Sequence, residues 1–169
     1  TGRDFIPRLF HLISTDDVRI AFFPNEIPVV VNDSLEKLYS LRRVFRSPVR
    51  GAFSSLFGDR VDPILDGMAF HNGVDIMCSY NTPLHPTRDG MVVFAGWRDG
   101  YGKMVVIQHD DGYGSLYAHC SSLKVSEGDW VTVRDTIALA GSTGRSTGSH
   151  LHFTLWRHGI IINPLLVIW

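Results

Sequence analysis

From residue 90 onward, apolar positions occur in short runs that are separated by glycine and polar residues. The runs read GMVVFAG, GKMVVIQH, GSLYAHC, DWVTV, TIALAG and HLHFTLW. Their connections are too short for crossover helices, which favours antiparallel pairing. RDGYGK at 98–103 and HDDGYG at 109–114 are predicted hairpin loops. The pattern therefore predicts a mainly β domain, whose antiparallel sheets form a small sandwich or barrel-like structure with a groove.

The first 45 residues follow a different pattern. VRIAFFP and IPVVV are strand-like, and NDSLEKLYSLRRVF has apolar residues at helical spacing behind a cap at Asp33 or Ser34. RSPVRG should end this helix, because the residue before Pro48 is driven out of the helical region. We therefore expect a short mixed N-terminal segment, residues 1–45, and a β domain, residues 46–169. The segment is interpreted as the end of a larger region or as a regulatory or linker segment.

Composition narrows the classes of partner. The chain has 169 residues, is 44% hydrophobic and carries a formal net charge of −1. These values are typical of a globular protein and give no electrostatic basis for binding nucleic acid or an anionic membrane. No apolar run approaches the roughly 18 residues of a membrane-spanning helix. The C-terminal GIIINPLLVIW is broken by Asn163 and Pro164, and is predicted to be a closing strand or core segment.

Neither the start of the chain nor its cysteines fix the compartment. The opening TGRDFIPRLF has no basic-then-apolar leader, so we expect any signal or anchor to lie outside this sequence. Cys78 and Cys120 match no metal-binding spacing, and two buried thiols or one disulfide both remain open.

The stretch GSHLHFTLW contains two histidines that are candidate site residues. His150 and His152 would share one face of a strand, about 6 to 7 Å apart, with Leu151 and Phe153 on the opposite, core face. Both histidines could therefore serve one site. Two half-exposed strand histidines are the alternative, since a metal site needs at least one more ligand.

A third ligand is available in FHNGVDIMC. Asn72-Gly73 is a turn signal and VDIM is strand-like, so a turn could bring His71 toward Asp75. Two histidines and one carboxylate, with water in a fourth position, form a catalytic zinc arrangement, although an Asp can also simply cap a turn. The loop GSTGRSTGS at 141–149 lacks the lysine and the following helix of a phosphate-binding loop, so it is interpreted as the wall of a site.

These motifs occur together in an order that resembles a known family. His71 and Asp75, then His119 in LYAHC, then HLH, resemble the zinc peptidoglycan endopeptidases of the lysostaphin and LytM family. FGDRVDPI, NTPLHPTRDGMVVFAG, YGKMVVIQH and INP are also similar, and the resemblance covers about residues 46 to 169. Thr154 stands where the family usually has Glu, and Pro86 where it has a small residue.

The resemblance implies a role for each matched residue. His71, Asp75 and His152 would hold one Zn²⁺, and His119 and His150 would act on water and on the transition state. A zinc ion lowers the pKa of its water to about 7, and a neighbouring imidazole can exchange protons with the reacting groups. The residues alone do not say which of His150 and His152 binds the metal.

Other candidates carry weaker signals. Arg60, Tyr101 and Tyr117 are candidate substrate contacts, and each also fits ordinary surface or packing. The remaining histidines are assigned no role: His11, His85, His109 and His158.

The expected function is zinc-dependent hydrolysis of a peptide bond in peptidoglycan cross-links or stem peptides, in the periplasm or outside the cell. Peptidoglycan peptides are the expected partners, and other cell-wall enzymes are candidates. The alternative is a non-catalytic member of the fold that binds and activates amidases; such members have lost zinc ligands, whereas this chain retains all of them. A purely structural zinc is disfavoured, because four protein ligands would close such a site. The sequence leaves open which peptide bond is cut.

Overall fold

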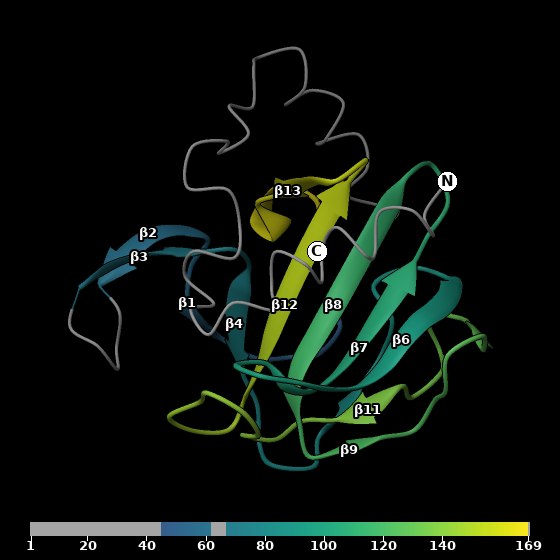
Figure 1. Ribbon diagram of the computed structural model, residues 1–169, viewed down its shortest axis with the longest axis horizontal. Helices are drawn as coiled ribbons and strands as arrows, with labels where there is room; N and C mark the ends of the chain where they lie inside the picture. The colour runs from purple at the N-terminus through teal and green to yellow at the C-terminus, as the bar shows by residue number, and fades with distance from the viewer. Residues whose placement is uncertain (1–44, 62–66, 169) are drawn as a thin grey trace.

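The computed structural model describes residues 45–61 and 67–168. The strand-like and helical patterns predicted before residue 45 lie outside the described residues. One large sheet forms the centre of the described part (Figure 1), in the order β1-β4-β12-β8-β7-β6-β10, with β13 paired to β12. Its strands are β1 (Phe53–Ser55), β4 (Val74–Met77), β6 (Gly90–Arg98), β7 (Gly102–Gln108), β8 (Tyr113–Cys120), β10 (Trp130–Val131), β12 (His150–Arg157) and β13 (Ile160–Ile162).

Two smaller sheets accompany the large one. β5 (Pro83–Leu84), β11 (Ala138–Leu139) and β9 (Ser122–Leu123) form a three-stranded sheet, and β2 (Gly58–Val61) pairs with β3 (Met68–His71). All strand pairs in the three sheets are antiparallel. The predicted mainly β, antiparallel fold is therefore confirmed. No described helix has the length and apolar character needed to cross a membrane.

Both predicted hairpins are present. β6 and β7 pair on either side of residues 99–101, and β7 and β8 on either side of residues 109–112. In the second loop, Asp111 and Gly112 have φ angles of 55° and 75°. The left-handed conformation of these two residues explains why an Asp-Gly pair occupies the turn.

The side chains of β12 alternate between two cores. Leu151, Phe153 and Leu155 belong to a large core that includes Val74 and Ile76 of β4. Trp156, from the other face of β12, belongs to a smaller core with Met104, Val106, Leu116 and Ala118. His150 and His152 have the same parity as Trp156, so they share its face, as the strand period predicts.

The C-terminal segment closes the large core. β13 pairs with β12, a short 3₁₀ helix (Pro164–Leu166) follows, and Ile168 forms a parallel bridge with Phe45. Phe45 is fully buried, and its ring centroid lies 4.9 Å from that of Tyr113. The β domain thus uses a residue that the sequence pattern assigned to the N-terminal segment. Cys78 and Cys120 are both free thiols.

Candidate metal centre

Strand register brings two of the three predicted ligands together. β4 and β12 are antiparallel neighbours, and Asp75 lies directly opposite His152. Side chains directly opposite each other in such a pair have Cβ atoms about 5 Å apart on the same face of the sheet. Residues 75 and 152 are therefore neighbours because of pairing, although 77 positions separate them along the chain.

His71 arrives from the end of β3, across a bend at Asn72-Gly73. The bend passes very close to β12, since a Cβ atom at Gly73 would lie only 2.1 Å from the carbonyl oxygen of Phe153. Glycine is thus required for the backbone to approach this strand. The close approach lets the ring of His71 reach the face that carries Asp75 and His152, as the predicted turn requires.

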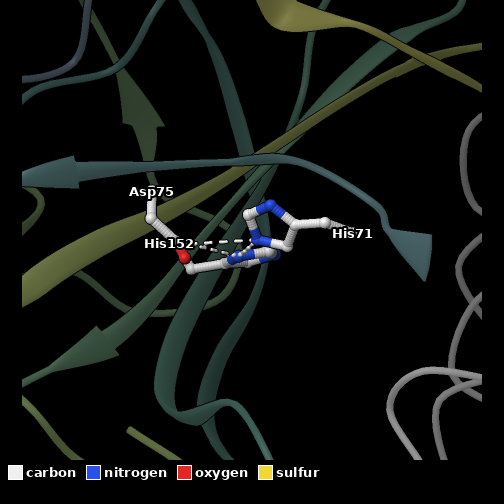
Figure 2. A group of neighbouring side chains, drawn as sticks. All are labelled: His71, Asp75 and His152. Carbon is white, nitrogen blue, oxygen red and sulfur yellow. Dashed lines mark hydrogen bonds and ion pairs between the residues drawn. The ribbon is translucent and has the colours of Figure 1, made fainter. Parts of the chain in front are cut away.

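Three side-chain atoms converge at this place, and Figure 2 shows the three side chains pointing toward one another. His71 Nε2 lies 3.1 Å from both Asp75 Oδ1 and His152 Nδ1, and His152 Nδ1 lies 3.0 Å from Asp75 Oδ1. The residues are only 5% to 8% exposed. Their atoms form a group that could hold a metal ion.

The outer hydrogen bonds indicate which nitrogens carry hydrogen. His71 Nδ1 lies 2.8 Å from the carbonyl oxygen of Leu56, which can only accept, so the hydrogen of a neutral His71 is on Nδ1. His152 Nε2 lies 2.8 Å from Asn72 Oδ1, which places its hydrogen on Nε2. His71 Nε2 and His152 Nδ1 then both present lone pairs to Asp75.

The ionisation of the group follows from burial and from its neighbours. Burial lowers the pKa of His152 to about 4, although contact with Asp75 opposes this change, so His152 is neutral at pH 7. Burial alone would raise the pKa of Asp75, but its contacts with His152 and His71 hold that pKa well below the usual range. Asp75 is therefore a carboxylate at pH 7.

A divalent cation fits this donor set. Three acceptor atoms, one of them charged, meet without a hydrogen between them, and a cation at their centre would satisfy all three. Two imidazole nitrogens and one carboxylate oxygen suit zinc, whose ligands at about 2.0–2.1 Å in a tetrahedral shell are about 3.3 Å apart. The separations of 3.0 to 3.1 Å are close to that value.

His119 and His150 lie beside the converging atoms. His150 Nε2 is 3.8 Å from Asp75 Oδ1, and the ring centroid of His119 is 4.9 Å from that of His150 and 6.0 Å from that of His152. Both histidines are oriented by the loop at 141–149: His119 Nδ1 donates to the carbonyl of Thr143 at 2.7 Å, and His150 Nδ1 donates to that of Gly148 at 2.8 Å. Each therefore keeps Nε2 available.

The position of His119 depends on a bulge. Lys103 pairs with Cys120 and Val105 with Tyr117, so β8 has one residue more than β7 in this interval. His119 has a φ angle of 63°, in the left-handed region. A bulge of this kind re-aims a side chain, and the conformation costs a non-glycine residue about 1–3 kcal/mol. Burial, with the neighbouring His152 and His150, lowers the pKa of His119 to about 3.

Two of the three predicted substrate-contact residues, Tyr101 and Tyr117, lie in the interior. Tyr101 and Tyr117 are 1% and 0% exposed, so neither phenol has surface with which to touch a substrate. The hydroxyl of Tyr101 accepts a hydrogen bond from Asn72, and that of Tyr117 accepts one from the Thr87 backbone. Both tyrosines are therefore interior residues whose hydroxyls bond to neighbouring protein groups. Arg60 lies in β2 opposite Ala69, and its contact with substrate stays a prediction.

Asn72 and Thr154 join the site without having been predicted. Both contact His152 Nε2, at 2.8 Å and 3.0 Å. Strand alternation could have found Thr154, because it shares the face of His152 two residues further along β12. The turn signal at Asn72-Gly73 does not indicate the contact of Asn72 with His152, because that contact spans 80 residues.

Comparison with known proteins identifies the family. Residues 69–164, which include the five predicted metal and catalytic residues His71, Asp75, His119, His150 and His152, match the model of Peptidase family M23. The chain belongs to peptidase family M23. The sequence-based resemblance to lysostaphin is also confirmed: the catalytic domain of lysostaphin from Staphylococcus simulans superposes with a TM-score of 0.62 at 30% identity, over 68% of this chain and 90% of that domain.

Other M23 relatives differ in their described roles. The DD-carboxypeptidase/endopeptidase Mpg of Neisseria meningitidis is 42% identical over 114 residues, which are 68% of this chain and 26% of Mpg. A zinc-containing peptidase from Vibrio cholerae has a TM-score of 0.65 at 31% identity, over 73% of this chain and 38% of that one. The murein hydrolase activator EnvC of Escherichia coli is 37% identical over 69% of this chain and 27% of EnvC. The chain thus spans about a quarter of the length of these curated relatives.

Proposed function

We propose that this M23 domain is a zinc-dependent endopeptidase that cleaves a peptide bond in peptidoglycan cross-links or stem peptides. The proposal rests chiefly on three buried acceptor atoms, from His71, Asp75 and His152, that converge within 3.1 Å of one another. Two histidine nitrogens with one carboxylate, and no fourth ligand in this group among the described residues, suit a catalytic zinc better than a structural one.

In the proposed reaction, three residues would hold the zinc ion and two further histidines would transfer protons. A zinc ion held by His71, Asp75 and His152 would lower the pKa of a coordinated water to about 7 and polarise the substrate carbonyl. His119 and His150, with Nδ1 hydrogen-bonded to loop carbonyls, present Nε2 to the reacting groups. There each imidazole can accept a proton or, once protonated, donate one to the developing oxyanion or the leaving amine.

The substrate class follows from the relatives. Mpg is named a DD-carboxypeptidase/endopeptidase, and the structural neighbour from V. cholerae is named a zinc-containing peptidase. A cell-wall peptide is therefore the proposed substrate, and the cell envelope or the periplasm is the proposed place of action. The similarity to EnvC favours a second candidate, in which the chain binds and activates other murein hydrolases. Retention of the complete donor set supports the enzyme over the activator.

The test compares wild-type chain with His119→Ala and His150→Ala on purified cell wall, with released muropeptides measured by mass spectrometry. Both variants should keep zinc, because neither residue belongs to the converging group, and should lose about 10²- to 10⁴-fold in rate. His85→Ala is the control, since His85 bonds to the Asp135 carbonyl instead of the site.

One outcome would overturn the endopeptidase, and another would overturn only the roles of His119 and His150. A zinc-loaded chain that releases no muropeptide but stimulates a purified cell-wall amidase would establish the activator. Equal hydrolysis by wild type and both alanine variants would remove His119 and His150 from the chemistry.

A further inference from the structure

The far side of the His152 ring is held by a buried polar cluster. His152 Nε2 lies 2.8 Å from Asn72 Oδ1 and 3.0 Å from Thr154 Oγ1. The Thr154 hydroxyl donates to Asn72 Oδ1 at 3.2 Å, and Asn72 Nδ2 donates to the Tyr101 hydroxyl at 2.8 Å. Asn72, Tyr101 and Thr154 are all buried, so water cannot replace these partners without opening the core.

The orientation of the Asn72 amide determines the tautomer of His152. An amide offers hydrogen from its nitrogen and lone pairs from its oxygen. With Nδ2 directed at Tyr101, the oxygen faces His152, so Nε2 must donate and Nδ1 keeps a lone pair. A reversed amide would donate to Nε2 instead, and the ring hydrogen would move to Nδ1, where it would point at Asp75 and exclude a metal ion.

We propose that Asn72, held between Tyr101 and Thr154, is the positioning residue that fixes His152 in the tautomer whose Nδ1 can bind a metal ion. This inference rests on the proposed metal centre and adds to it the group that prepares one of the ligands. Histidine ligands are commonly oriented through their second nitrogen, and loss of such a partner typically lowers metal affinity 10- to 100-fold.

The cluster also keeps the centre low in negative charge. The second nitrogen of His71 bonds to a backbone carbonyl, and that of His152 bonds to a side-chain amide and a hydroxyl. Asp75 therefore supplies the one negative charge among the three ligand residues and these partners. A carboxylate at position 72 would raise the basicity of His152, whereas the amide orients the ring without adding charge.

The experiment measures zinc affinity by chelator competition and the His152 tautomer by ¹⁵N NMR, in the full chain. Asn72→Ala should lower zinc affinity about 10- to 100-fold and remove the protected Nε2–H signal of His152. Asn72→Asp keeps an oxygen at the same place and should restore both. Thr154→Val, matched in shape but without the hydroxyl, should give a smaller loss than Asn72→Ala, and Thr154→Ser should bind as wild type does.

Each outcome has a distinct meaning. Zinc affinity unchanged in Asn72→Ala would overturn the role of Asn72 while leaving the proposed metal centre intact. A hydrogen on Nδ1 of His152 in the zinc-loaded wild type would overturn both that role and the binding of the metal through His152 Nδ1. A wild-type chain that binds zinc no better than His152→Ala would instead overturn the metal centre. If circular dichroism shows that Asn72→Ala does not fold, wild type is compared with Asn72→Asp and Thr154→Val instead. An Asn72→Asp chain with the wild-type His152 tautomer and zinc affinity supports the proposal. An Asn72→Asp chain that has lost both refutes it.

Discussion

His109 and His152 are buried to nearly the same degree, with 4% and 5% of their surface exposed. Burial lowers the pKa of each to about 4. By burial and ionisation alone, the two histidines are equivalent. They differ in what their two ring nitrogens meet.

Both nitrogens of His109 have complementary partners. Nδ1 lies 2.9 Å from the carbonyl oxygen of Asp89 and donates to it, and Nε2 lies 2.7 Å from the Ser115 hydroxyl, which can donate in return. Ser115 also shares a 2.8 Å hydrogen bond with the Tyr117 hydroxyl. His152 Nδ1, in contrast, faces a carboxylate and a second lone pair. The direction of the hydrogen bonds, not a lowered pKa, thus separates a candidate ligand from a structural histidine.

The largest expected difference concerns metal binding. His152→Ala should reduce zinc from about one ion per chain to a trace and abolish hydrolysis, because no neighbouring group can replace Nδ1 at the same geometry. His109→Ala should keep its zinc, although it loses stability. Metal analysis of the two purified variants makes the comparison, and zinc loss from His109→Ala in a folded chain would contradict the distinction.

A second difference should appear in the pH dependence of stability. His109 has a folded-state pKa of about 4, below the ordinary value of 6.5, so between these values the unfolded chain binds a proton that the folded chain refuses. Stability from this residue is complete above pH 6.5, falls as pH decreases toward 4, and is about 3 kcal/mol lower there.

His109→Gln tests this linkage, because glutamine does not titrate. The variant should be less stable than wild type at pH 7, and the gap should narrow by about 3 kcal/mol at pH 4. Urea unfolding with chelator present checks it, since the other histidines are common to both chains. A gap that stays constant from pH 7 to pH 4 would show that His109 is not the residue responsible.

The smallest expected effect is that of Ser115→Ala. It removes the hydroxyl between His109 and Tyr117 and should cost about 1–2 kcal/mol in unfolding free energy, through the buried groups left unpaired. Zinc content and hydrolysis should not change. Denaturation and metal analysis on one preparation would measure stability and zinc content. Reduced zinc affinity would contradict the expectation that the His109–Ser115–Tyr117 cluster is independent of the metal centre.

Local patterns predicted most of the fold and the face on which the site lies. Strand alternation put His150 and His152 together and Leu151 and Phe153 in the core, and Asn72-Gly73 marked the bend beside His71. Contacts that depend on distant pairing were not predictable in this way. The bulge that re-aims His119 exists only because β8 pairs with β7, and Asn72 meets His152 only because β4 lies beside β12.

The burial of Tyr101 and Tyr117 was also not predictable from local patterns. The sequence left substrate contact and ordinary packing open for both residues, and both side chains are buried. Tyr117 is buried because β8 is covered on both faces by the two cores, and Tyr101, just before β7, packs in the smaller core. Whether a strand is covered on one face or two depends on the neighbouring elements, which the sequence pattern of that strand does not contain.

The pairing of β4 with β12 has a consequence for the order of events during folding. His71 and Asp75 are close along the chain, but His152 joins them only after a loop of more than 70 residues has closed. Closure of such a loop is slow relative to local hairpin formation. A growing or partly folded chain therefore has two of the three donor groups while it still lacks the third. At the proposed metal centre, binding by all three ligands would therefore require that β12 has entered the sheet.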